Sequence, residues 1–432
     1  MASKWQWRWQ RVSRQIWVPV TAYGVLGIGT ALGAVLLKPF IPVGLSTKIG
    51  ANAVESLLNI LATSMLTVTT FSLSIMLAAF AQASNEATPR ATFLLKADVT
   101  TQRVLATFIG AFIYALVGII ALKTGIYGEN GRLVLFLATV LVLALIVANL
   151  LRWIAHLTEF GRLSDTIGRV ETAARNALET RLAHPYLGAH AQTSPPPPTA
   201  APILAVETGY VQNIDLAAIS ALAEAQDARL WLHALPGAFV HPAYVLAHLE
   251  PMPDDSGAAD AVRQHLRNAF SVAESRTFDQ DPRFGVMAMT EVASRALSPA
   301  VNDPGTGIDV LGRLVRVLSI WNERPETELI HPRLWVPPLR VEDLVTDAFN
   351  PIARDGAGLI EVQVRLQKAL LALAEIAPEV FGQAVAGQSA RALVMAENVL
   401  TLAEDKARLR DLSARVAQAA AAGLGVLPGG RA

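Results

Sequence analysis

The chain has 432 residues, 36 of them basic and 36 acidic; 52% are hydrophobic and only 17% are charged. An average soluble domain carries about 25% charged residues, so this composition argues against a wholly soluble protein. The formal net charge is zero, and the sequence shows no basic stripe of the kind that nucleic-acid-binding proteins use. The absence of cysteine excludes disulfides, thiolate zinc sites and cysteine nucleophiles.

Four apolar runs dominate the first third of the chain, and each is long enough to cross a bilayer as a helix. Arg152, at the end of the fourth run, is their only charged residue of the Asp, Glu, Lys and Arg types. The connections between the runs are short, which favours a compact helical bundle. The predicted spans are residues 16–37, 57–81, 104–122 and 133–154.

Lysine and arginine residues near the spans predict the orientation of the bundle. Eleven lie in the amino-terminal tail, the second connection and the stretch after the fourth span, whereas four lie in the other two connections. The positive-inside rule therefore predicts that both termini are cytoplasmic. Tryptophans beside the first and fourth spans fit an aromatic belt at the same interface, with core packing as the alternative. They are Trp5, Trp7, Trp9, Trp17 and Trp153.

After the spans, the predicted secondary structure of the chain changes twice. Residues 1–155 form the predicted transmembrane domain, and 156–202 a helical connector that ends in a proline-rich spacer. Residues 203–253 are β-rich, and 254–432 are mostly helical. The fold class is thus a four-span helical membrane bundle followed by a cytosolic α+β domain. The helices predicted there are residues 216–226, 258–276, 282–297, 304–321, 341–349, 361–376 and 389–412.

Two of these helices begin with the same dipeptide. Asp281 precedes Pro282 and Asp303 precedes Pro304, so each helix has a capping carboxylate followed by a proline at its first position. Asp215 is predicted to cap the helix at 216–226 in the same way.

The second span carries a line of hydroxyl and amide side chains. They recur every three or four residues, which places them on one stripe of a helix. Such a stripe is costly to expose to lipid, so it faces other helices or water. Interhelical hydrogen bonding is one interpretation; the other is a hydrated pathway lined by the stripe. The predicted pore-lining residues are Asn59, Thr63, Thr67, Thr70 and Ser74, and the line begins at Asn52 and Ser56.

Small residues indicate where the spans pack closely. Gly29 and Gly33 form a GxxxG pair in the first span, and Gly110 and Gly118 mark a face of the third. The alternative is that these glycines are simply tolerated in membrane helices.

The sequence contains no recognisable catalytic or metal-binding motif. No two of the eight histidines have the spacing of a helical zinc site, and no HExxH, GxSxG, GxxxxGK[ST] or GxGxxG pattern occurs in a suitable context. Acidic residues near Asp281 and Asp303 do not suggest a cation site, because these two already have capping roles. We therefore expect no enzymatic activity, no cofactor and no metal.

Four segments carry a resemblance to known proteins: SNEATPR (84–90), GYVQNID (209–215), RTFDQDPRFG (276–285) and ALSPAVNDP (296–304). Together they resemble a family of bacterial predicted membrane proteins, domain of unknown function 2254. The resemblance covers nearly the whole chain and implies a four-span inner-membrane protein with a cytosolic carboxy-terminal domain. Within the cytosolic motifs, the candidate site residues are Arg276, Gln280, Asp281, Asn302 and Asp303.

A local likeness concerns residues 237–249, which look like half of a barrel-sandwich module of the biotinyl or lipoyl type. Such carriers need a lysine at the hairpin tip, and no lysine occurs between Lys123 and Lys368. A swinging-arm role is therefore excluded, and the module is expected to be structural or to hold a ligand.

Two functions of different classes fit these features. The first is a homo-oligomeric channel for ions or a small solute, with the second span around the path and the cytosolic domain for assembly or gating. The second is a membrane-anchored sensor or scaffold without transport activity. The expected partners are the lipid bilayer, further copies of the chain and the permeating species, and not nucleic acid.

Overall fold

The computed structural model describes residues 18, 20–22, 24–25, 28–29, 51–96, 98–124, 128–158, 160–322 and 328–424. They fall into two compact units. The span unit comprises Arg8–Asn85 and Thr92–Thr166, and the carboxy-terminal unit contains Glu86–Ala91 and Ile167–Ala432.

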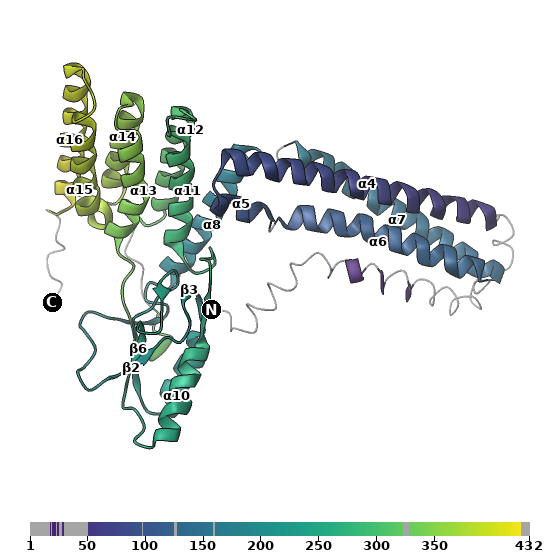
Figure 1. The fold of residues 1–432 in the computed structure, drawn as a ribbon, viewed down its shortest axis with the longest axis horizontal. Helices are drawn as coiled ribbons and strands as arrows, with labels where there is room; N and C mark the ends of the chain where they lie inside the picture. Colours follow the sequence, from purple (N-terminus) through teal and green to yellow (C-terminus); the bar gives the residue numbers. More distant parts are fainter. Residues whose placement is uncertain are drawn as a thin grey trace. The chain divides into compact units, whose positions relative to one another are not determined.

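The described residues of the span unit include three long helices: α4 (Ala51–Glu86), α6 (Val99–Lys123) and α7 (Gly128–Leu157) (Figure 1). A short helix, α5 (Pro89–Lys96), lies between α4 and α6 in the sequence. The stretches long and apolar enough to cross a membrane are Ala53–Ser84, Thr100–Lys123 and Leu133–Leu157. The described residues therefore contain three candidate spans, which match the second, third and fourth expected ones. The first expected span, 16–37, lies largely outside the described residues.

The core of the span unit joins α4, α6 and α7. Leu58, Phe108 and Leu135 are almost completely buried there. Interhelical hydrogen bonds supplement this packing: Trp153 Nε1 donates to Ser72 Oγ at 3.0 Å, and the hydroxyls of Tyr114 and Thr139 lie 3.2 Å apart. Trp153 is only 2% exposed. It is a core residue and does not belong to an aromatic belt; the other four tryptophans of the predicted belt lie outside the described residues.

In the carboxy-terminal unit, the described residues form eight strands in two sheets. The larger sheet has the order β1-β8-β4-β6-β2, with β8 parallel to β1 and β4 and the remaining pairs antiparallel. The smaller sheet is antiparallel with the order β5-β3-β7. The strands are β1 (Ala189–Ala191), β2 (Ala201–Leu204), β3 (Gly209–Ile214), β4 (Arg229–Leu232), β5 (Phe239–Val240), β6 (Val245–Glu250), β7 (Phe270–Ala273) and β8 (His331–Val336).

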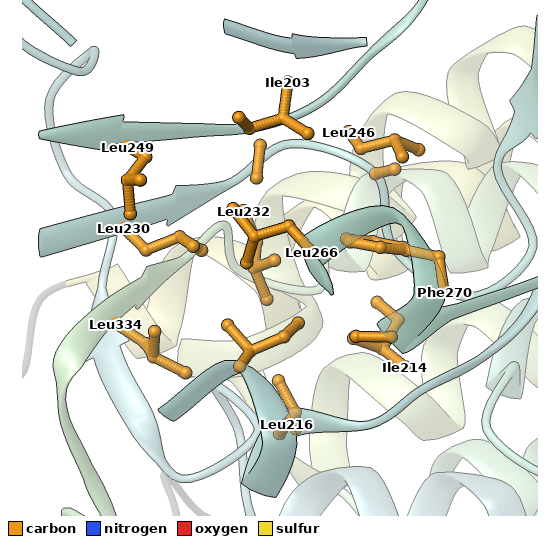
Figure 2. Packing of buried hydrophobic residues seen from close by; sticks show 14 of the residues in the cluster. Ile203, Ile214, Leu216, Leu230, Leu232, Leu246, Leu249, Leu266, Phe270 and Leu334 are labelled. Carbon is orange, nitrogen blue, oxygen red and sulfur yellow. The ribbon is translucent and has the colours of Figure 1, made fainter. Parts of the chain in front are cut away.

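Both sheets share one apolar core with two helices, α9 (Leu216–Ala225) and α10 (Ser256–Ala269). Figure 2 shows Leu230, Leu232 and Leu334 of the larger sheet facing this core. Leu216 of α9 and Leu266 of α10 belong to the same cluster (Figure 2). Burial of such side chains contributes about 1.5–3 kcal/mol each, so this cluster is what holds the two sheets together.

The expected barrel-sandwich-like module is not present among the described residues. Its expected half, residues 237–249, divides between two sheets, since β5 pairs with β3 in the small sheet whereas β6 pairs with β4 and β2 in the large one. The large sheet also recruits β1 and β8, which lie outside residues 203–253. The parallel pairs of β8 with β1 and β4 need long crossover connections. An alternating pattern within one short segment does not show which distant strand will pair with it.

Seven further helices lie in the part of the carboxy-terminal unit that the structure describes. From α11 onward they form three consecutive pairs, with α11, α13 and α15 in contact along one row and α12, α14 and α16 along the other (Figure 1). A Cβ on Gly285 of α11 would lie 2.6 Å from the Cα of Ala174 in α8, so only glycine permits this approach. The helices are α8 (Leu163–Ala183), α11 (Pro282–Ala296), α12 (Pro304–Leu318), α13 (Val341–Asp355), α14 (Ile360–Ile376), α15 (Pro378–Glu397) and α16 (Ala403–Leu424).

The capping predictions are confirmed by hydrogen bonds. Asp281 Oδ1 accepts from the amide of Phe284 at 3.1 Å, and Asp303 Oδ1 accepts from that of Thr306 at 3.0 Å. Asp215 caps α9 in the same way, at 3.1 Å from the amide of Ala218. These carboxylates satisfy amides that the first helical turn leaves unpaired.

Three helix predictions were wrong in extent. The helix expected at 341–349 continues through Pro351 to Asp355 as α13. The helix expected at 258–276 ends at Ala269, because the next residues form β7 against β3. The helix expected at 389–412 is the end of α15 and the start of α16, which are separate helices packed on each other.

Candidate functional site

The polar line on α4 lies on the exposed side of that helix in the described bundle. The buried side is formed by Val54, Leu58, Leu61 and Met65, which pack toward α6 and α7. At 100° per residue, the polar line runs down the middle of the opposite face. Its five predicted pore-lining residues are all exposed: Asn59, Thr63, Thr67, Thr70 and Ser74.

Three hydroxyls of this polar line bond to carbonyl oxygens one turn earlier in α4. Thr67 Oγ1 donates to Thr63 O at 2.9 Å, and Thr70 Oγ1 donates to Leu66 O at 2.8 Å. Ser74 Oγ donates to Thr70 O at 3.0 Å. This back-bonding lowers the cost of placing hydroxyls in an apolar setting. Their oxygens keep free lone pairs on the exposed face.

The predicted packing glycines differ in their surroundings. Gly110 and Gly118 are buried in α6, and a Cβ on Gly118 would lie 3.1 Å from Leu58 Cδ1 of α4. A Cβ on Gly29 would meet no atom within 4 Å. Gly33 lies outside the described residues.

Two of the motif segments in the carboxy-terminal unit lie side by side. The amide of Ile214 in β3 donates to Gln280 Oε1 at 3.3 Å, and Gln212 Nε2 donates to the carbonyl of Ser275 at 2.7 Å. The GYVQNID and RTFDQDPRFG segments, which are 60 residues apart in the sequence, therefore form one local structure at the start of α11.

A cavity of about 400 Å³ opens beside this structure, entirely within the carboxy-terminal unit. Its walls come from the end of α8, the connection between β4 and β5, the start of α11, and the segment from β8 into α13. Three of the predicted motif residues, Arg276, Gln280 and Asp281, line it. Its charged lining consists of four arginines and three aspartates: Arg181, Arg276, Arg283, Arg340, Asp281, Asp343 and Asp347.

Two of the arginines in the cavity wall are neutralised by the aspartates. Arg276 binds Asp281 through two hydrogen bonds, Nε to Oδ2 at 2.7 Å and Nη2 to Oδ1 at 3.0 Å. Arg283 Nε donates to Asp347 Oδ2 at 2.7 Å, and its Nη1 donates to Asp343 Oδ2 at 2.8 Å. Burial raises the pKa of Asp281, and the Arg276 guanidinium acts in the opposite direction.

Gly237 allows the ion pair between Arg276 and Asp281 to form. Gly237 has φ of +91°, and a Cβ there would collide with the Asp281 carboxylate, with Cγ at 2.7 Å. It would also lie 3.0 Å from Arg276 Nη2. Only glycine combines this backbone conformation with so close an approach.

The remaining motif residues lie elsewhere. Asn302, with φ of +50°, and Asp303 lie in the turn between α11 and α12, at the opposite end of α11 from the cavity. In the same carboxy-terminal half of α11, Arg295 Nη1 donates to the carbonyl of Ala87 at 3.0 Å, and Glu291 pairs with Arg90. The five predicted motif residues therefore divide between two places.

Sequence reasoning missed the rest of the cavity wall. Arg283 lies within a quoted motif, which was the one available signal. Arg181 belongs to the expected helical connector, Asp343 and Asp347 belong to the helix expected at 341–349, and Arg340 directly precedes that helix. Among the described residues, no group of three His, Asp or Glu side chains is placed to hold a metal ion.

Comparison with known proteins assigns the chain to a family. The family model described as "Predicted membrane protein (DUF2254)" matches residues 13–372. Uncharacterized proteins of Mycobacterium bovis and of Mycobacterium tuberculosis strain H37Rv are each 28% identical over 323 residues, which is 72% of this chain and 61% of theirs. The chain thus spans less than two thirds of the length of these relatives, and no solved structure matches it. The protein belongs to the DUF2254 family of predicted membrane proteins.

Proposed function

We propose that the protein assembles as a homo-oligomeric pore for ions or a small solute in the bacterial inner membrane. The observation that carries this proposal is the exposed polar line on α4, residues Asn59 to Ser74, which crosses an apolar candidate span. Polar side chains in a membrane helix seldom face lipid and most often face protein or water.

The position of the polar line argues against a role in packing α4 onto α6 or α7. Those helices contact the other side of α4, where Trp153 of α7 donates a hydrogen bond to Ser72. The polar line is bordered by exposed apolar residues, Ile60 and Phe71 on one side and Leu66 and Leu73 on the other. Such borders suit contacts between neighbouring copies, with the polar line facing a shared axis.

In this proposal both termini are cytoplasmic, and the carboxy-terminal unit serves assembly or gating rather than catalysis. A pore needs side-chain or backbone dipoles that replace the hydration of a permeating ion. The lone pairs of Thr67 and Thr70 offer such dipoles in the middle of Ala53–Ser84.

Ion flux into liposomes reconstituted with the protein tests the proposal. The double substitution Thr67→Leu with Thr70→Leu should dewet the middle of the path and reduce flux at least about tenfold, with the oligomer intact. Thr69→Val is the matched control, since Thr69 lies in the same turn on the half-buried side of α4 and bonds to Met65 O. Its flux should match that of the unmutated protein.

Oligomer mass in detergent is measured for every variant. A monomeric unmutated protein, unchanged flux in the double variant, or no flux under any tested voltage, tension or pH contradicts the pore. The second candidate, a membrane-anchored sensor or scaffold, would then lead. The cavity in the carboxy-terminal unit favours this second candidate, because a sensor or scaffold needs a binding site. Membrane helices that only anchor such a domain do not need the polar line on α4.

A further inference from the structure

One arginine in the cavity wall differs from its neighbours. Arg181, in the last turn of α8, is only 6% exposed. Its Nη2 donates to the carbonyl of Pro337 at 3.3 Å, and its Nε has no hydrogen-bond partner. Among the described residues, no carboxylate lies within ion-pair distance of it, in contrast to Arg276 and Arg283.

Arg181 nevertheless keeps its charge. Burial lowers its pKa to about 10, which leaves the guanidinium protonated at neutral pH. An unpaired buried cation is costly, and proteins normally pair such a group or use it. The structure therefore places an uncompensated positive charge, with an unused N–H, at the wall of the cavity.

The other groups in the cavity wall do not supply the missing negative charge. Asp281 is engaged by Arg276, and Asp343 and Asp347 are engaged by Arg283. Arg340 adds a further positive charge, and its closest carboxylate, on Glu342, is 3.9 Å away. The four arginines exceed the three aspartates by one positive charge, and among the described residues of the cavity wall Arg181 is the arginine that forms no ion pair.

The cavity has the size and lining of a small-molecule site. Its volume of about 400 Å³ lies within the range of ligand pockets, roughly 300–1,000 Å³. Leu235, Met287 and Leu339 contribute apolar wall beside the charged groups. This combination suits a small organic molecule with one anionic end.

We propose that this cavity binds a small organic anion whose phosphate or carboxylate group pairs with Arg181. Guanidinium groups recognise both anions through paired N–H donors, and a planar fork is suited to bidentate contact. Arg340 is the second cation available to the ligand, and the apolar wall takes the uncharged part. The proposal is independent of the pore, since it concerns only the carboxy-terminal unit.

Isothermal titration of the full-length protein in neutral detergent tests the site, with inorganic phosphate and succinate as separate probes at constant ionic strength set by chloride. At least one probe should bind saturably. Arg181→Gln should weaken that binding at least about tenfold, because it removes the buried charge. Arg175→Gln is the matched control on the same helix, since Arg175 is exposed and paired with Glu179. Its binding should be unchanged.

Thermal unfolding separates binding from a structural role. Without probe, Arg181→Met should unfold at the same temperature as the unmutated protein or higher, because it removes an unpaired buried charge. With probe, only the unmutated protein should gain stability. A lower midpoint of Arg181→Met without probe, or equal gains with it, contradicts the proposal.

Leu339→Trp provides a test that leaves every arginine in place. The larger side chain should fill the cavity and abolish probe binding. Saturable binding that persists in Leu339→Trp, binding by Arg181→Gln equal to that of the unmutated protein, or no binding of either probe by the unmutated protein would each overturn the site.

Discussion

At the scale of single residues, the two Asp-Pro helix starts show how one local pattern serves two purposes. Asp303 hydrogen-bonds within its own turn, to Thr306. Asp281 caps α11 and also neutralises Arg276, and its side chain is only 4% exposed. The identical dipeptides predict identical caps, and only the surroundings add the ion pair.

Substitutions at these two positions should therefore differ in cost. Asp303→Ala should lower the free energy of unfolding by about 0.5–2 kcal/mol through the lost cap. Asp281→Ala should cost about 3–5 kcal/mol, because it also leaves the Arg276 guanidinium buried without its partner. Denaturant titration of the full-length protein, followed by circular dichroism, measures both values.

Asparagine variants separate the two contributions. Asn caps helices as well as Asp does, so Asp303→Asn should be nearly neutral. Asp281→Asn keeps the cap but loses the ion pair, and should remain strongly destabilising. Equal costs for Asp281→Asn and Asp303→Asn would contradict the assigned difference.

At the scale of elements, a charged cluster joins α8 to α12. Glu171 of α8 accepts hydrogen bonds from Arg313 Nη1 and Arg316 Nε, each at 2.8 Å. Burial alone would raise the pKa of Glu171, but the hydrogen bonds and charges of Arg316 and Arg313 outweigh it, so that the pKa lies below its usual value. The cluster ties α8 to the pairs of helices that follow the sheets.

Glu171→Gln should destabilise the carboxy-terminal unit by about 1–3 kcal/mol at pH 7, the usual range for hydrogen bonds to charged groups. Because the pKa of Glu171 is lower in the folded state, its contribution is full above the unfolded pKa of about 4.3 and disappears as the pH falls through the folded value. The difference between the two proteins should therefore shrink at acidic pH. Thermal unfolding of the full-length protein between pH 7 and pH 3 measures it.

Glu179→Gln is the control for that series. Glu179 lies on the same helix in an exposed pair with Arg175, and such pairs contribute little. A loss for Glu179→Gln as large as that for Glu171→Gln, or a Glu171→Gln difference that grows toward acidic pH, would refute the role of the cluster.

At the scale of the whole molecule, the proposed orientation rests on the distribution of basic residues around the spans. A periplasm-specific reporter fused after Ala432 should be silent, and the same reporter fused after Lys123 should be active. The reverse pattern would move the carboxy-terminal unit to the other side of the membrane. The basic residues on the predicted cytoplasmic side are Lys4, Arg8, Arg11, Arg14, Arg90, Lys96, Arg103, Arg152, Arg162, Arg169 and Arg175, against Lys38, Lys48, Lys123 and Arg132.

Features that depend on neighbouring residues were predictable from the sequence. The apolar runs that became α4, α6 and α7, the polar line on α4, and the caps at Asp215, Asp281 and Asp303 all follow from short-range spacing. Hydrophobic length and side-chain hydrogen bonds within one turn act over a few residues, so the local sequence is sufficient to specify them.

Features that join distant segments were decided by the tertiary structure. β8 enters the sheet between β1 and β4 although nearly 100 residues separate it from β4, and α10 ends where β7 pairs with β3. The cavity combines Arg181, Arg276 and Arg340 from three separate segments. The sequence alone determined which segments are long and apolar enough to span a membrane and where helices begin. Only the tertiary structure decided that Arg181 would be buried without a counter-charge, because burial and charge pairing depend on which remote segments pack together.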